Sequence, residues 1–156
     1  MWNQLSDRPD IDRLRHYVET VLAQRGDEIE FMVLFGSMAR GNWSPGSDFD
    51  LLIGLRIDDG KRFLDRIYEY ERIAPGPIEP FPYGYGEWTR MWRDLHLTFL
   101  EAADHGVPLF DRGAWAQIQK EFGQHLAVGA VERRPGGWQR FPDRLQAPRP
   151  PSLVER

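Results

Sequence analysis

The sequence contains no cysteine among its 156 residues, which excludes disulfide bonds and thiolate metal sites. No run of apolar residues approaches the roughly 20 residues that a membrane-spanning helix needs. Residues 1–12 are polar and lack the apolar core of a signal peptide, so we expect a cytoplasmic protein without a membrane partner. The net charge of −4 disfavours a dedicated nucleic-acid coat protein, and nucleic acid is not an expected partner.

Apolar residues are frequent enough to form a folded core. The sequence is 41% hydrophobic, with nine Phe, six Trp and five Tyr, and its length suits one domain. Helical spacing predicts four helical regions: one between Asp10 and Gly26, one from Asp58 to Pro75, one over 88–105 in one or two pieces, and one from Trp115 to about Gly129. The second of these is expected to bury Phe63, Leu64, Ile67 and Tyr68.

Three apolar segments, 29–35, 50–55 and 78–83, predict strands, and residues 106–110 predict a shorter extended segment. The first is almost wholly apolar, which is typical of a central strand. The third contains Pro80 and Pro82, which cannot donate hydrogen bonds to a neighbouring strand, so we expect it at a sheet edge. The order of these elements predicts an α/β (α+β) fold in which a small mixed sheet is flanked by helices.

The composition changes after Val131. Residues 132–156 contain five prolines and six arginines, and few apolar residues remain to offset the entropy of ordering the chain. We therefore predict a domain over residues 1–131, followed by a Pro- and Arg-rich C-terminal tail over residues 132–156. This tail is expected to be disordered or wrapped over a partner.

Two aspartates follow a Gly-Ser pair at a fixed spacing. Ten residues separate Ser37 from Asp48, and Asp50 follows two positions later. Side chains two apart on a strand point to the same face, where two carboxylates repel each other unless a cation such as Mg²⁺ neutralises them. For an isolated Asp-x-Asp an ordinary turn role is the better interpretation, but the Gly-Ser pair at this spacing favours a metal site.

The residues around this Gly-Ser pair are candidates for holding a phosphate. Gly36, at a strand end, allows backbone N–H groups to approach an anion closely, and Ser37 adds a hydroxyl donor at the start of a short helical turn. Arg40 has two interpretations: it pairs with a phosphate, or with Asp48 or Glu30 on the surface. The Gly-Ser pair alone is weak evidence.

A third carboxylate would complete a metal site of this kind. Glu79 is the best candidate because it begins the third apolar segment, whereas Glu87 and Asp94 lie in helical or turn segments. The four histidines lack metal-ligand spacing and are expected to be ordinary surface or core residues; they are His16, His96, His105 and His125.

These motifs resemble the DNA polymerase beta-like nucleotidyltransferase superfamily, and more closely its minimal nucleotidyltransferase (MntA-like) family. The signature of that family is Gly-Ser, ten residues and Asp-x-Asp, and the contexts Ala39-Arg40-Gly41 and Ser47-Asp48 also fit. The resemblance covers roughly residues 28–111. It implies Mg²⁺ and a nucleoside triphosphate, usually ATP, with transfer of the nucleoside monophosphate and release of pyrophosphate.

The resemblance also implies roles for particular residues. Asp48, Asp50 and Glu79 would be the catalytic metal ligands. The nucleotide would be held by Gly36, Ser37, Arg40 and Ser47. The sequence departs from the family in its third acid, which is Glu rather than the more usual Asp and is followed by two prolines.

Many minimal nucleotidyltransferases are antitoxins that pair with a HEPN-domain toxin, and some adenylylate that partner. The resemblance therefore implies an antitoxin that transfers AMP from ATP to a partner protein. Two alternatives stay open: a non-catalytic neutralising subunit that retains the fold, and a small-molecule (antibiotic) nucleotidyltransferase, which would need an acceptor pocket. Oligomer formation, with itself or with a partner, is also left open by the sequence.

Overall fold

The computed structural model describes residues 1–145; residues 146–156, which belong to the predicted tail, lie outside the described residues. No helix of residues 1–145 is both long and apolar enough to cross a membrane. The helices are η1 (Trp2–Leu5), α1 (Ile11–Arg25), η2 (Gly26–Glu28), α2 (Ser37–Arg40), α3 (Phe63–Glu71), α4 (Tyr85–Arg93), α5 (Leu97–His105), α6 (Ala114–Ala127) and η3 (Pro142–Arg144). The strands are β1 (Ile29–Phe35), β2 (Phe49–Leu55), β3 (Ile78–Tyr83), β4 (Val107–Asp111), β5 (Val131–Arg134) and β6 (Gly137–Arg140).

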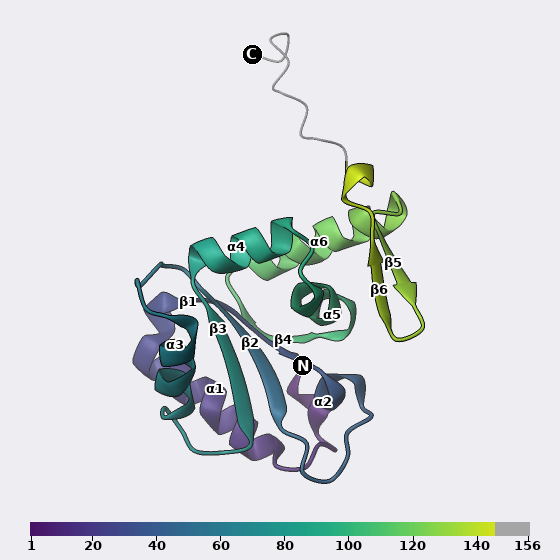
Figure 1. The fold of residues 1–156 in the computed structure, drawn as a ribbon. Helices are drawn as coiled ribbons and strands as arrows, with labels where there is room; N and C mark the ends of the chain where they lie inside the picture. Colours follow the sequence, from purple (N-terminus) through teal and green to yellow (C-terminus); the bar gives the residue numbers. More distant parts are fainter. Residues whose placement is uncertain (146–156) are drawn as a thin grey trace.

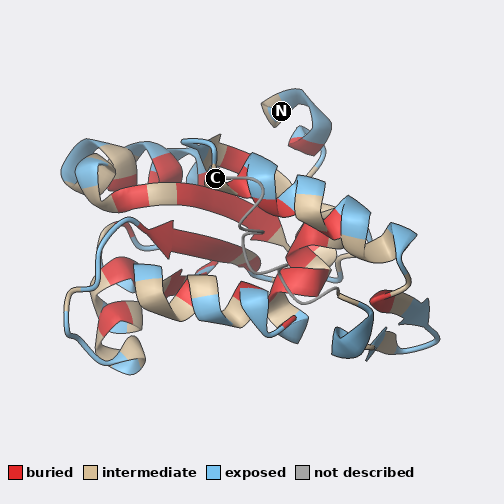
Figure 2. Cartoon of the chain, turned by 90° about the horizontal axis from the view of Figure 1, so that it is seen from above, coloured by how far each residue is buried: buried red, intermediate tan, exposed pale blue. Residues whose placement is uncertain are grey.

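A four-stranded mixed sheet forms the centre of the molecule, in the order β3-β2-β1-β4 (Figure 1). Strand β1 pairs antiparallel with β2 and β4, whereas β2 and β3 run parallel. Helix α1 packs on one face of the sheet, and α4, α5 and α6 cover the other. The view from above shows the buried strands between these helices (Figure 2). The predicted α+β fold with a small mixed sheet flanked by helices is therefore confirmed.

Strand β2 directs alternate side chains to the two faces of the sheet, as the period of a strand requires. Its odd-numbered residues from Phe49 to Leu55 belong to the core beneath α1, whereas Leu52 belongs to the core beneath α4–α6. Gly54 leaves room on the second face, because a Cβ there would lie 2.3 Å from the Phe31 ring. The same alternation places Asp50 on the α4–α6 face.

Strand β3 lies at the edge of the sheet, as its prolines predicted. Arg66 of α3 donates a hydrogen bond of 3.0 Å to the Pro82 carbonyl, which shows that this residue's backbone faces away from β2. Pro80 has the same orientation because it lies two positions earlier. Glu79, which lies directly before Pro80, therefore directs its backbone toward β2. The two prolines do not interrupt the pairing of the strands, because their missing N–H groups would face away from β2.

The buried face of α3 differs from the prediction. Leu64 and Tyr68 are 54% and 49% exposed, whereas Arg66 and Tyr70 are buried. The guanidinium of Arg66 lies 2.8 Å from Asp59 and 2.6 Å from Glu87, so the buried charge is paired on both sides. A pattern that treats every arginine as a surface residue cannot find such a network.

The C-terminal part of the described chain also differs from the prediction. Strands β5 and β6 pair as an antiparallel hairpin. Val131 is buried in the α4–α6 core, and Trp138 packs against that core, with its ring 5.7 Å from the ring of Phe122. Residues 132–145 thus include a hairpin that packs on the fold, whereas a separate tail was predicted, because Trp138 and Leu145 supply the apolar contacts with the core.

Candidate active site

Two acidic side chains lie next to each other where β2 and β3 begin. Asp50 of β2 and Glu79 of β3 are partners in the parallel register. Asp48 precedes β2 and lies two positions before Asp50. Asp50 is half-buried, whereas Asp48 and Glu79 are exposed. The sheet therefore brings together acids that lie about thirty positions apart in the sequence.

The surroundings of Asp50 make its negative charge costly. Burial first, and then the charge of Glu79, a hydrogen bond with Glu79 and the charge of Asp48, together raise the pKa of Asp50 to about 6, while the charge of Arg40 opposes them. A divalent cation beside these acids would remove the repulsion that raises this pKa. The three carboxylates therefore fit Mg²⁺ by charge and by donor chemistry.

The protein alone does not complete a metal shell at this place. No three or more histidine, aspartate or glutamate side chains of residues 1–145 are arranged closely enough to hold a metal ion. Mg²⁺ usually retains several waters and takes substrate phosphates as ligands, with only one or two carboxylates from the protein. An open group of acids is compatible with that kind of coordination.

Gly36 lies directly against Asp50. Its φ is +75°, and a Cβ at this position would lie 2.3 Å from Asp50 Oδ2. Its N–H group donates a hydrogen bond of 2.9 Å to His105 Nε2. The glycine is thus required by the approach of a carboxylate, and its amide, which we expected to face a phosphate, already has an acceptor.

The turn after Gly36 is a single helical turn of four residues. The carbonyl of Gly36 accepts hydrogen bonds from the N–H groups of Ala39 and Arg40, and the carbonyl of Ser37 accepts from Gly41 and Asn42. A turn this short adds little helix dipole. Among residues 1–145 the Ser37 hydroxyl has no hydrogen-bond partner, so it is free to donate to a ligand.

Arg40 adds positive charge close to the acids. Its guanidinium lies 3.7 Å from Glu101 Oε2 of α5, and its charge lowers the pKa of Asp50 against the other influences. The surface pairing with Asp48 or Glu30 that we considered is not formed. The side chain is 43% exposed, which leaves it accessible to an anion.

Ser47 shapes the loop that leads to Asp48. Its hydroxyl accepts a hydrogen bond of 3.0 Å from the Ser44 N–H, and its own N–H donates to the Ser44 carbonyl at 3.0 Å. We expected this serine to contact the nucleotide. The structure shows it closing the turn immediately before the first aspartate, and the contact with a nucleotide stays a prediction.

The alternative third acids are occupied elsewhere. Glu87 accepts hydrogen bonds from Arg66 at 2.6 Å and from the Gly84 N–H at 2.8 Å, and Asp94 is an exposed residue at the end of α4. Of the three acids weighed from the sequence, Glu79 alone is a register partner of Asp50.

Two residues near the site were missed by the sequence analysis, Arg8 and His105. Arg8 donates a hydrogen bond of 2.6 Å to the Met38 carbonyl, and its guanidinium lies 4.8 Å from the centre of the Trp43 ring. His105 accepts the hydrogen bond from Gly36. Neither residue is part of a recognisable motif. Both contacts join segments that are distant in the sequence, so no local sequence signal could have revealed the two residues.

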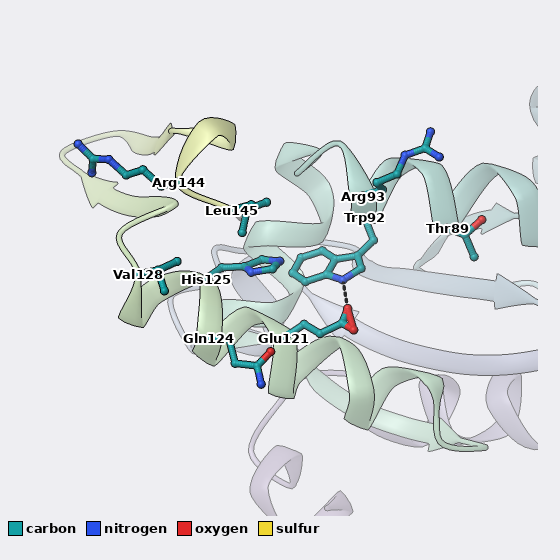
Figure 3. Close-up of a pocket in the computed structure, with 9 residues that line it drawn as sticks. All are labelled: Thr89, Trp92, Arg93, Glu121, Gln124, His125, Val128, Arg144 and Leu145. Atoms are coloured by element: carbon teal, nitrogen blue, oxygen red, sulfur yellow. Dashed lines mark hydrogen bonds between the residues drawn. The ribbon is translucent and has the colours of Figure 1, made fainter. Parts of the chain in front are cut away.

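Two hollows of the surface differ in their relation to the acids. A cavity of about 460 Å³ has Asp48 in its wall, and its other lining residues include Met38, Trp43, Pro45, Ser47 and Pro77. A cavity of about 650 Å³ lies between α4, α6 and Leu145 (Figure 3). There the Trp92 ring stacks on His125 and donates a hydrogen bond to Glu121, but none of the candidate acids lines it.

Carboxylates on adjacent strands beside a glycine turn are typical of enzymes that transfer phosphoryl-type groups with a divalent metal. The family model described as nucleotidyltransferase domain matches residues 16–78 of the chain. The match includes Gly36, Asp48 and Asp50 and ends one residue before Glu79. The resemblance predicted from the sequence is therefore confirmed. A comparison with curated proteins finds no match.

Solved structures similar to this chain include a protein from Sulfolobus solfataricus assigned as a nucleotidyltransferase. It has a TM-score of 0.48 and 24% identity, and the similarity covers 65% of this chain and 79% of that one. A toxin–antitoxin complex with AMP-PNP has a TM-score of 0.48 and 13% identity, over 73% and 90% of the two chains. A mutant of the toxin–antitoxin pair MntA-HpeT also has a TM-score of 0.48 and 13% identity, over 74% and 89%.

Proposed function

We propose that this protein is a Mg²⁺-dependent nucleotidyltransferase that transfers a nucleoside monophosphate, AMP from ATP, to an acceptor hydroxyl on a partner protein. The observation that carries this proposal is the register of Asp50 with Glu79, with Asp48 two positions before Asp50 and Gly36 packed against the Asp50 carboxylate. In the reaction, the acceptor hydroxyl gives up its proton to solvent and its oxygen forms a bond to the α-phosphorus. The bond from the α-phosphorus to the oxygen that bridges it to the β-phosphate breaks, and that oxygen leaves with pyrophosphate.

Each site residue has a role that follows from its position. Asp48, Asp50 and Glu79 would hold Mg²⁺, which when bound neutralises the triphosphate and activates the attacking oxygen. The free hydroxyl of Ser37 would donate a hydrogen bond to a phosphate oxygen. Arg40, exposed and close to Asp50, would add a charge-assisted contact to the same group. Positioning and charge neutralisation supply most of the rate in such reactions.

A partner protein is the acceptor that best suits this chain. The helices and strands of residues 1–145 pack around one central sheet, and no second domain of these residues encloses a small acceptor. A macromolecular acceptor would bring its hydroxyl to the exposed acids with its own surface. A HEPN-domain toxin, which the sequence resemblance implies, is the first acceptor to test.

The test is incubation of the protein with Mg²⁺, a candidate toxin and ATP labelled at either the α- or the γ-phosphate. Nucleotidyl transfer predicts label on the partner from α-labelled ATP and none from γ-labelled ATP. Asp48→Asn and Asp50→Asn should abolish labelling, whereas Asp94→Asn, an exposed aspartate away from the site, should not. Label from the γ-phosphate, or label that survives Asp50→Asn, would contradict the proposal.

The same variants separate chemistry from simple binding. If Asp48→Asn and Asp50→Asn still neutralise the toxin in cells, contact is sufficient and the protein is a neutralising subunit. If both variants lose neutralisation while they still bind the toxin in a pull-down assay, transfer is the cause of neutralisation. Parallel reactions with GTP, CTP and UTP measure the base preference.

A further inference from the structure

His105 ends α5 and reaches the glycine turn beside the acids. Its Nε2 accepts a hydrogen bond of 2.9 Å from the Gly36 N–H, across 69 positions of sequence. The His105 side chain is 12% exposed, so this hydrogen bond is largely shielded from water. This hydrogen bond occupies the Gly36 N–H group, which the sequence analysis expected to contact a phosphate.

The hydrogen bond defines the proton on the imidazole ring. A ring nitrogen that accepts an N–H bond carries no proton, so a neutral His105 has its proton on Nδ1. Nδ1 lies 3.5 Å from Glu101 Oε2, and the same Glu101 oxygen lies 3.7 Å from Arg40. The ring is thus oriented between Gly36 on one side and an acidic group on the other.

The charged groups around the ring come from three elements. Burial is the main cause that lowers the pKa of His105, and the charge of Arg40 in α2 lowers it as well. The charges of Glu101 and Asp104 in α5 act in the opposite direction. Asp104 is itself paired with Arg133 of β5. The lowered pKa and the hydrogen bond that Nε2 accepts from Gly36 both favour the neutral ring.

The end of α5 is held rigidly where it presents the ring. A Cβ on Gly106 would lie 2.3 Å from the Ala102 carbonyl oxygen and 2.7 Å from Val33 Cγ1 of β1. Glycine at this position lets the helix end rest directly on the central strand. The position of His105 relative to β1, and hence relative to Gly36 one residue beyond β1, is therefore fixed by backbone packing.

We propose that His105 is a positioning residue for nucleotide transfer: its neutral Nε2 fixes the amide of Gly36 and thereby holds the turn that carries Ser37 and supports the Asp50 carboxylate. This inference rests on the proposed function. Without an acceptor, a part-buried N–H group is left unpaired, and the hydrogen bonds that Gly36 keeps are those that its carbonyl accepts from Ala39 and Arg40 on the other side of the residue. Any movement of Gly36 would also move Asp50, whose carboxylate lies against it.

Two substitutions and one control test this role. His105→Leu removes the acceptor, His105→Gln places an amide oxygen near the position of Nε2, and His16→Leu makes the same change at an exposed histidine of α1. We expect His105→Leu to lower kcat/KM for ATP by about tenfold to a hundredfold, the effect of one lost buried hydrogen bond. His105→Gln should stay within about threefold of the wild type, and His16→Leu should match it.

The amide resonance of Gly36 in the ¹H–¹⁵N spectrum supplies a measurement that needs no nucleotide. We expect it to move upfield in His105→Leu and to stay near its wild-type position in His105→Gln. In the wild type it should also move as the His105 ring protonates at low pH, because the protonated ring cannot accept. Asp50, which lies against Gly36, also titrates in this range, so the two proteins are compared in an Asp50→Asn background. There the movement should be absent from His105→Gln, and this comparison decides the matter even if His105→Leu does not fold.

Several results would overturn the inference. These are an unmoved Gly36 resonance in His105→Leu, wild-type transfer by a folded His105→Leu, or equal losses in His105→Leu and His105→Gln. Failure of the wild type to transfer label from ATP to any partner would overturn the proposed function instead. The Gly36 resonance would still show whether His105 holds the turn, so the two failures are distinguishable.

Discussion

Replacing Asp50 by asparagine should remove activity and yet stabilise the folded protein. Asparagine has nearly the same shape as aspartate but carries no charge. In the folded protein the charged form of Asp50 is disfavoured by burial and by Glu79 and Asp48, which together raise its pKa to about 6. The substitution removes that cost, so Asp50→Asn should be more stable than the wild type wherever Asp50 would be ionised.

The size of the effect follows from the shift. A rise from 3.8 to about 6 corresponds to about 3 kcal/mol at about 1.4 kcal/mol for each pKa unit. Asp50 is only half-buried, and solvent screening reduces such energies, so we expect about 1–2 kcal/mol. Because the folded-state pKa is raised, the native state is favoured at low pH, and this stability is lost as the pH rises through about 6.

The assay is urea denaturation at pH 4 and at pH 8, without divalent cations, for the wild type and Asp50→Asn. At pH 8 the variant should unfold with a free energy about 1–2 kcal/mol larger than that of the wild type. At pH 4 the difference should be much smaller, because Asp50 is then mostly protonated in the folded protein, while in the unfolded chain its pKa of 3.8 leaves it only partly ionised. Asp94→Asn, at an exposed position, controls for the general effect of removing a negative charge.

A variant that is no more stable than the wild type at pH 8, or one that gains equally at both pH values, would refute this reasoning. Added Mg²⁺ provides a second check. A cation that binds the acids of the folded protein should raise the Tm of the wild type, and it should raise the Tm of Asp50→Asn less.

Three further predictions concern the surroundings of these acids. Gly36→Ala should cost about 2–4 kcal/mol of stability in urea denaturation, because alanine is strained at this φ and its Cβ would collide with Asp50. Arg66→Met should cost about 3 kcal/mol in the same assay, because it leaves two acidic partners of a buried cation unpaired; an unchanged midpoint would contradict the network. Glu79→Gln should lower the pKa of Asp50 toward its ordinary value, which carboxyl ¹³C NMR can follow, since it removes a neighbouring negative charge.

Features of the site that depend on local spacing were predictable. Asp48 lies near enough to Asp50 for its charge to raise the Asp50 pKa, as their spacing of two positions predicted, and Gly36 follows a strand whose apolar residues mark it as central. The prolines of β3 predicted an edge strand because they lack N–H groups. Glu79 was chosen among three acids because it alone begins a strand, and the parallel register then placed it beside Asp50.

Features that join distant segments were not predictable. Arg40 pairs with Glu101, and His105 reaches Gly36, through contacts that form only when α5 packs on β1. The buried Arg66 was missed because its burial depends on two acids that come from other segments. The packing of Trp138 on the core was not predicted, because a single ring in a Pro- and Arg-rich segment shows no periodicity.

The sequence by itself determined the class of fold, the order of its main elements up to α6, and where Gly36, Asp48 and Asp50 lie relative to the strands, because these depend on strand and helix periods and on covalent spacing. Only the tertiary structure decided which acid joins Asp50, why its pKa rises, and what occupies the Gly36 amide. Those properties arise from burial and from contacts between segments that packing brings together. Residues far apart in the sequence carry no local signal of such contacts.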